Sequence, residues 1–539
     1  MGMSWIVRHL LAALLIGSLW TPAVYSQSNW TSIEFFGLTG GLADGLDPTA
    51  LKPNEASDLQ NVIFSTSGGI QKRNGFAQIN ASAACGGESF TGLFMYKQSD
   101  GDRFLLGVCA NDTLVKMDYA GGTTGPDGTW DTITGSLSFA VGQNEIADFT
   151  TVQDVAIIED GLNTTPPYVY TGTGNATSLQ ASDADVPNAT MVEFHNRILW
   201  VAGRSDARSR IDLSNLDAYT TWTATDNILV ETDDNQVITG LKSALDCLYV
   251  FKTESIHRIC GRDRDNLRLE QMVRGIGAAS NAAIEVINNK FVFLTSQGDI
   301  AIYDGGINVQ FISEKIKGTL TSSVVDFGRF QYASAATLDD SEFYLSLSTA
   351  GSGTHNLILM YDVDWQAWTK FSGLNANTLA VYEEGTQERA IIFGDYSGFA
   401  NQYPSGTSDA GSSIEAYWQS GHLKFDTPTQ KTFREMQLFV RQEGTYSITF
   451  EHRVDFATTG TSNSISLSGT GALWDTAVYD TDSWADLITN IVRIRNMDVT
   501  GDFFQWRIED TSTNNPFLLR GARLWYEPLP HAIGGTPTP

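Results

Sequence analysis

Short hydrophobic runs separated by turn residues dominate the chain between residues 88 and 406. Each run is a short stretch of mostly apolar residues, and Gly, Asp, Asn or Pro follows. The clearest case is 290–306, KFVFLTSQGDIAIYDGG, in which an apolar run turns at Gln297-Gly298-Asp299 and returns. Short apolar runs bounded by turn residues in this way predict β-hairpins. Patterns typical of long amphipathic helices are hard to find in the chain.

The hairpins recur as a loose unit of roughly 40 to 50 residues, a spacing typical of repeat folds. The segments that fit this unit are 104–130, 155–172, 197–222, 248–261, 290–306, 343–371 and 391–403. A small sheet cannot bury both of its faces alone, so such units stack around an axis and close into a ring. We therefore predict a β-propeller of about six to seven blades over residues 88–406.

The pattern changes after a Gly/Ser-rich break at 405–413. The strands expected there alternate apolar and polar side chains, as half-buried antiparallel strands do; they are 435–441, 446–454, 491–495, 503–508 and 518–526. We predict a β-sandwich or jelly-roll-like domain over 414–528 and a flexible tail over 529–539. The whole chain is expected to be all-β.

An N-terminal arm over 27–87 is predicted to precede the first blade. Pro53 and Glu55 suit the first turn of a short helix that ends near Gln60. A hairpin is expected next, with strands at 61–65 and 70–74 joined by Gly68-Gly69.

Charge argues against tight binding to nucleic acid. The formal net charge is -28, with 62 acidic and 34 basic residues, and no block of Lys or Arg stands out. Proteins bind a phosphate backbone by placing Lys and Arg against it. An acidic surface would let DNA slide past without adhesion, although solubility alone explains such a charge equally well.

The first 26 residues resemble a signal peptide. Arg8 and His9 precede an apolar run over 10–20, and Val24-Tyr25-Ser26 suits a peptidase site. The run is about half as long as the roughly 20 residues that a membrane-spanning helix needs. We therefore expect a cleavable leader over 1–26 and no membrane anchor.

Four cysteines form two pairs that are close in the sequence, Cys85 with Cys109 and Cys247 with Cys260. Each pair flanks a predicted hairpin, so export would permit two disulfides. Four reduced, buried thiols are the equal alternative. No Cys-x-x-Cys pair or Cys/His spacing for zinc occurs, and we expect neither a metal nor a cofactor.

Catalytic patterns are weak, and we expect no enzyme activity. No clean Gly-x-Ser-x-Gly elbow occurs, and Asp127-Gly128-Thr129-Trp130 only approaches a sialidase repeat. Acidic pairs such as Glu159-Asp160 are assigned to solvated turns, because neighbouring side chains on a strand point to opposite faces. His195 and His257 are interpreted as structural.

Several motifs together carry a family resemblance. The arm motifs are Gly40-Gly41-Leu42, Leu51, Glu55, Asn61-Val62, Gly68-Gly69-Ile70 and Lys72-Arg73-Asn74-Gly75-Phe76. Further motifs lie at 160–170, 248–259, 275–306, 473–484 and 501–507. In this order they resemble the tail nozzle and packaged-DNA stabilisation (tail hub) proteins of short-tailed bacteriophages. Each motif is degenerate and mostly structural.

The resemblance implies a structural virion protein of the tail. It implies a homo-oligomeric ring, six copies in the family, that closes the DNA channel and holds packaged DNA until ejection. Partners would be tail proteins on the adaptor or portal side and tail fibres or spikes, and DNA would pass without tight binding. The alternative is an exported, extracellular β-propeller that binds glycans or hydrolyses glycosides, consistent with the leader.

Lys72 and Arg73 are the basic pair of the arm, and two interpretations stay open. They are either a solvated hairpin edge, where lysine discourages strand pairing, or a contact to an acidic neighbouring subunit. The resemblance favours the subunit contact.

Overall fold

The computed structural model describes residues 30–529 except 112, 120–124, 134–141, 385–387, 426–428, 442–445, 468–488 and 514–516. The expected leader lies outside the described residues, as does nearly all of the expected tail. So do Trp474 and Trp484 of the C-terminal motif. In the described part of the chain, no helix is long and apolar enough to cross a membrane.

Seven four-stranded antiparallel sheets are present in the described chain. Their strands, blade by blade from the innermost outward, are: β6 Phe90–Lys97, β7 Arg103–Cys109, β8 Leu114–Asp118, β9 Asp131–Ile133; β10 Asp148–Val152, β11 Val155–Glu159, β12 Tyr168–Tyr170, β13 Thr177–Ser178; β14 Met191–His195, β15 Ile198–Ala202, β16 Arg210–Leu213, β17 Asn227–Leu229; β18 Ile238–Ala244, β19 Cys247–Lys252, β20 Ser255–Cys260, β21 Arg268–Arg274; β22 Ile284–Ile287, β23 Lys290–Leu294, β24 Ile300–Tyr303, β25 Val309–Phe311; β26 Ser334–Leu338, β27 Glu342–Ser348, β28 His355–Asp362, β29 Ala367–Phe371; and β30 Thr378–Glu384, β31 Glu388–Gly394, β32 Ala400–Tyr403, β5 Ala77–Gln78.

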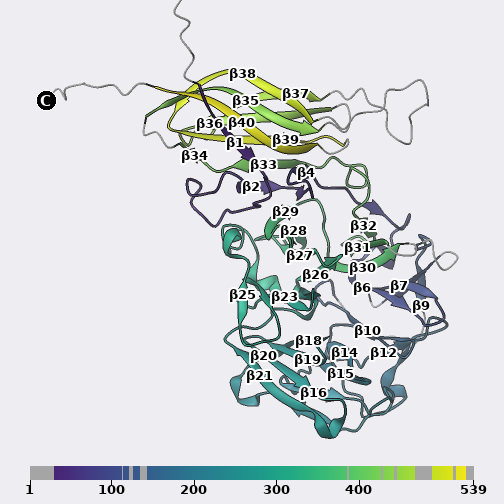
Figure 1. Ribbon diagram of the computed structural model, residues 1–539. Coiled ribbons are helices and arrows are strands. Elements are labelled where there is room, and N and C mark those ends of the chain that lie inside the picture. Colours follow the sequence, from purple (N-terminus) through teal and green to yellow (C-terminus); the bar gives the residue numbers. More distant parts are fainter. Residues whose placement is uncertain are drawn as a thin grey trace, which may run out of the picture.

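The seven sheets are the blades of a closed propeller (Figure 1). Each innermost strand contacts the innermost strand of the next blade, and β30 of blade 7 returns to β6 of blade 1. Strand β5 from the N-terminal part of the chain pairs with β32 and completes blade 7. The ring is thus closed by strands from both ends of the propeller sequence, and the predicted all-β propeller is confirmed with seven blades.

Two six-stranded sheets form the second domain. The first has the order β3-β4-β40-β35-β38, with β1 also paired to β40, and the second has the order β2-β33-β39-β36-β37, with β34 also paired to β39. Their strands are β1 Thr31–Phe36, β2 Ala56–Gln60, β3 Val62–Phe64, β4 Ile70–Lys72, β33 Ala416–Ser420, β34 Leu423–Lys424, β35 Lys431–Arg441, β36 Tyr446–Val454, β37 Thr461–Leu467, β38 Thr489–Gly501, β39 Phe503–Asp510 and β40 Leu518–Pro528. Alternate side chains of both sheets, among them Met436, Leu438 and Trp506, are buried in one core.

Helical structure in the described chain is limited to short 3-10 turns. They are η1 Cys85–Gly87, η3 Leu179–Ala181, η4 Thr232–Asp234, η5 Arg264–Asn266, η6 Asn281–Ala283, η7 Glu314–Ile316 and η8 Phe327–Tyr332. Such turns connect strands, and some add a buried side chain to the core, as Ile316 and Phe330 do.

The short helix expected in the arm is wrong, because residues 56–60 form strand β2. One turn closes where Glu55 N–H donates to the Lys52 carbonyl, and the chain then extends. Strand β2 pairs with β33, and Leu59 lies opposite Trp418 in the register. Pairing and burial against β33 therefore override the local preference for a helix. The expected hairpin is present as β3 and β4, and Gly68 takes a positive φ of 84° in its turn.

The arm joins three sheets and ties the two domains together. Strands β1, β3 and β4 extend one sandwich sheet, β2 extends the other, and β5 belongs to blade 7. Strands β2 and β3 also contact β29, the outermost strand of blade 6. Figure 1 shows the sandwich seated on this side of the ring. The arm, both sandwich sheets and blades 5 and 6 share one hydrophobic cluster.

Candidate functional site

Arg73 is buried at the junction between the arm and the propeller. Its Nη1 and Nη2 donate to the two carboxylate oxygens of Asp409, at 2.8 and 2.6 Å. Its Nε donates to Asn61 Oδ1 at 2.8 Å, and Nη2 also donates to the Ser372 carbonyl at 2.8 Å. A bidentate guanidinium pair with further acceptors is a strong, directional contact. It joins β4 to the end of blade 6 and to the linker that follows blade 7.

Lys72 is buried beside it, with an exposed fraction of 1%. Its Nζ lies 3.5 Å from Asp510 Oδ2 and donates to the Ser512 carbonyl. Burial lowers the pKa of Lys72, and the charge of Asp510 opposes that shift. Neither interpretation of the basic pair is therefore correct. Lys72 and Arg73 lie neither at a solvated edge nor at a surface open to another subunit, because their acidic partners are in the same chain.

The four cysteines are paired within the chain. Cys85 is bonded to Cys109, with a Cα–Cα distance of 5.8 Å, and Cys247 to Cys260, with 4.6 Å. Cys247 and Cys260 are direct register partners on β19 and β20. Of the two alternatives left open by the sequence, disulfides or reduced thiols, the structure contains a disulfide at both pairs. No cysteine in the described chain is free.

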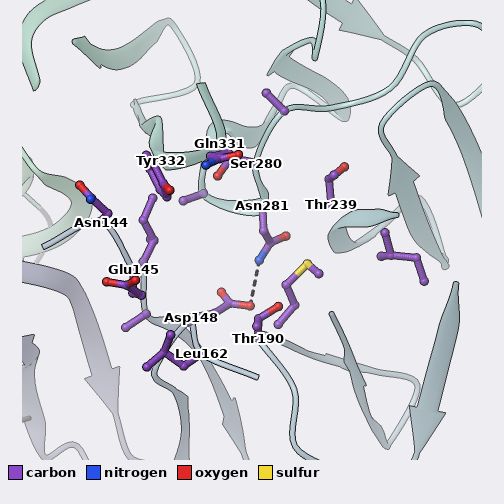
Figure 2. A pocket seen from close by; sticks show the side chains of 17 residues that line it. Asn144, Glu145, Asp148, Leu162, Thr190, Thr239, Ser280, Asn281, Gln331 and Tyr332 are labelled. Carbon is purple, nitrogen blue, oxygen red and sulfur yellow. Dashed lines mark hydrogen bonds between the residues drawn. The ribbon is translucent and has the colours of Figure 1, made fainter. Parts of the chain in front are cut away.

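A cavity of about 340 Å³ opens at one mouth of the propeller channel. Its wall is made by the segments that lead into the innermost strands of blades 2 to 6 (Figure 2). Hydroxyl and amide groups supply most of its polar lining, from Thr190, Thr239, Ser280, Asn281 and Gln331, and Tyr332 adds an aromatic ring. This composition offers hydrogen bonds to a polar ligand.

Four ionisable side chains lie on the innermost strands next to this mouth. They are Asp148 on β10, Glu193 on β14, Lys242 on β18 and Glu285 on β22, and each is half-buried. Asp148 Oδ2 accepts from Val192 N–H at 2.9 Å and from Asn281 Nδ2 at 2.8 Å, a contact visible in Figure 2. The group thus combines three carboxyls with one lysine.

Burial controls the protonation of these carboxyls. It raises the pKa of Glu193 to about 7 and that of Glu285 to about 7, and the charge of Lys242 opposes both shifts. Burial likewise raises the pKa of Asp148, against the charge of Lys242. Lysine 242 is thus a shared cation for carboxyls from three different blades.

Glu159 is a buried carboxyl without a hydrogen-bond partner in the described structure. It faces Asp148 in the register of β10 and β11. Burial raises its pKa well above the usual value, and the charges of Asp160 and Asp148 add to the shift. The solvated turn expected for Glu159-Asp160 is therefore wrong, because both residues are almost completely buried.

The carboxyls of this site can take up and release protons near neutral pH. Carboxyls with a pKa near 7 suit general acid–base chemistry. However, no group of three or more His, Cys, Asp or Glu side chains that could hold a metal ion occurs in the described residues. His195 and His257 are buried, and a ring nitrogen of each lies within hydrogen-bond distance of a hydroxyl group, that of Ser243 and of Ser255 respectively. Sequence reasoning missed Asp148, Glu193, Lys242 and Glu285, because it did not recognise the innermost strands that carry them.

Stability is expected to fall as the pH rises from about 4.5 to about 7. Unfolded glutamate titrates near 4.5, whereas folded Glu193 and Glu285 release their protons near 7. In this window the folded state holds protons that the unfolded state has lost, so raising the pH favours unfolding. We expect a loss of roughly 1–2 kcal/mol for each carboxyl, since a tenfold change in proton affinity equals about 1.4 kcal/mol and channel water screens part of it.

Urea denaturation at several pH values measures this loss. The double variant E193Q/E285Q should flatten the pH dependence, whereas E254Q, at an exposed turn, should retain it. An unchanged pH profile in E193Q/E285Q would contradict the assignment.

No family model matches the sequence, and no curated protein matches it. Among solved structures, the chain is similar to the WD40 β-propeller domain of Doa1 (TM-score 0.37, 8% identity, 60% of this chain and 96% of that chain). It is also similar to the Neurospora crassa Pan2 WD40 domain (TM-score 0.38, 7% identity, 64% and 98%). The extracellular domain of BT4673 from B. thetaiotaomicron matches over 81% of this chain and 62% of its own length (TM-score 0.39, 11% identity). The topology itself defines the class, a seven-bladed β-propeller that carries a β-sandwich.

Proposed function

We propose that this chain is a structural virion protein, a subunit of the tail nozzle of a short-tailed bacteriophage. Copies of it would form a ring that closes the DNA channel and holds packaged DNA until ejection. Neighbouring tail proteins would contact the ring, and DNA would pass without tight binding.

The observation that carries this proposal is what the motif at 40–76 does in the fold. Its residues have packing roles rather than chemical ones. A Cβ on Gly41 would meet the backbone of Trp368 on blade 6, and Asn61 binds Ser372 and the Glu415 carbonyl. Arg73 binds Asp409. The segment that resembles nozzle proteins thus packs against both β-domains and joins them, a role that suits a structural subunit.

The charge distribution supports the same function. Between residues 88 and 406 the chain has 41 acidic and 20 basic residues. A surface of this charge repels a phosphate backbone rather than adhering to it. A ring that must let DNA leave the particle benefits from such repulsion.

Electron microscopy of particles tests the proposal. Antibody raised against the chain should label the distal tail of particles from cells that express it, and image reconstruction should show a closed ring of copies. Particles assembled without the chain should lose nuclease-protected DNA. Absence of the chain from particles, with purified protein that stays monomeric, would refute the function.

A second candidate is an exported propeller that binds or cleaves glycans. Two observations favour it: the two disulfides and the channel mouth lined by hydroxyl and amide groups beside Tyr332. A glycan array with a sugar-release assay tests it. Sequencing of the mature N-terminus separates the two functions, because a start near Gln27 supports export.

A further inference from the structure

One face of the sandwich carries several exposed aromatic, aliphatic and arginine side chains. It is the outer face of the sheet formed by β1, β40, β35 and β38. Three rows of side chains cross these strands in register. The first row contains Phe36, Gly521, Phe439 and Ile491; the second contains Glu34, Arg523, Gln437 and Arg493; the third contains Ser32, Trp525, Glu435 and Arg495. We call this surface the arginine face.

The first row of the arginine face is an apolar ridge. Phe36 and Ile491 are each 50% exposed. The Phe36 ring crosses over Gly521, where a Cβ would meet it, and reaches Phe439 with a centroid distance of 5.3 Å. Exposed aromatic side chains held in such a row are typical of contact surfaces between proteins.

The other two rows contain three arginines and two glutamates, a net charge of +1. Arg495 lies 3.4 Å from Glu435, and Arg523 pairs with Glu34 and lies over the Phe439 ring. Arg493 is exposed and has no ion-pair partner in the described part of the chain. Arginine beside aromatic residues is the composition that contributes most to binding at interfaces.

The rest of the chain supplies a complementary surface. The hairpin turns within the blades place exposed aspartates at the end of the ring away from the cavity mouth. Asp100, Asp246, Asp339 and Asp340 lie between first and second strands, and Asp304 and Asp364 between third and fourth strands. In an antiparallel blade both kinds of turn lie on the same side. We call this surface the aspartate face.

We propose that the arginine face binds the aspartate face of a second copy of this chain. Two copies that each carry a net charge of -28 repel each other, so a stable contact needs a local patch of opposite sign. The contact joins two different surfaces and leaves one of each free, which is the arrangement that builds a ring. This inference rests on the proposed ring function and specifies the surface that forms it.

Sedimentation velocity of the full chain tests the contact. We expect assembly at about 50 mM salt and dissociation at about 500 mM, because salt screens exposed charges. The variant R493E/R523E should associate at least about tenfold more weakly. The matched control R208E reverses an exposed arginine between β15 and β16, at the other end of the ring from the aspartate face, and should assemble like the original chain.

Two further experiments identify the partner surface. Mixing R493E/R523E with D339K/D340K should restore association, because the reversed charges again attract. A photo-crosslinking amino acid in place of Ile491 should link to blade turns of an isotope-labelled second copy. A link to residues 468–488 of the same chain, to DNA or only to another protein would overturn the inference.

Different results would refute the contact made by the arginine face and the nozzle function. If rings form and R493E/R523E assembles as well as the original chain, the arginine face is refuted and the nozzle function stands. If the original chain stays monomeric at low salt, the self-contact is refuted, and labelling of particles decides the function separately.

Discussion

Replacing Arg73 with alanine is expected to lower the free energy of unfolding by about 3–5 kcal/mol, the usual cost of removing one partner of a buried ion pair. The change leaves Asp409, 9% exposed, without its cation. It also removes the donors to Asn61 Oδ1 and the Ser372 carbonyl. Urea denaturation followed by tryptophan fluorescence measures the loss.

Two variants make the measurement specific. R73K keeps the charge but loses the planar fork, so it should fall between R73A and the original chain. R268A removes an exposed arginine and should change the stability by less than about 0.5 kcal/mol. An R73A midpoint that matches R268A would show that the junction does not depend on the ion pair.

Replacing Gly75 with alanine is expected to destabilise the protein by about 1–3 kcal/mol or more, the usual cost of overpacking. A Cβ at this position would overlap the backbone of Ser408. The backbone cannot move away easily, because Gly75 N–H donates to the Gly406 carbonyl at 3.0 Å and Ser405 N–H donates to the Gly75 carbonyl at 2.8 Å. The arm and the linker after blade 7 are in contact here.

Gly353 provides the matched control for Gly75. A Cβ on Gly353 would meet nothing within 4 Å, and its backbone does not have a positive φ. G353A makes the same chemical change and should therefore be close to neutral. Thermal unfolding of both variants measures the difference, and equal melting temperatures would contradict the close packing at Gly75.

The hairpins of the propeller were largely predictable from the sequence. Each of the seven predicted segments covers all or part of the second and third strands of one blade; 290–306, for example, holds β23 and β24. These strands are apolar and buried on both sides, so their pattern is strong. The innermost strands were missed because their composition is mixed, as in SAATL of β26 and MVEFH of β14.

The sandwich was predicted only in part. The sequence pattern indicated strands within β35, β36, β38, β39 and β40, which alternate clearly. It did not indicate that the arm adds β1 to β4 to the same domain. That pairing joins residues far apart in the sequence, such as Phe35 with Ala522, and no local pattern encodes it.

The sequence alone determined the local structure of this protein: short strands, glycine turns and an all-β chain, because alternation and turn residues act over a few neighbouring positions. Only the tertiary structure decided that residues 56–60 form a strand, that Lys72 and Arg73 are buried, and that Lys242 lies among carboxyls from three blades. These outcomes depend on distant partners. A local helix preference differs by less than about 1 kcal/mol per residue, whereas a buried ion pair or a large core side chain changes stability by several.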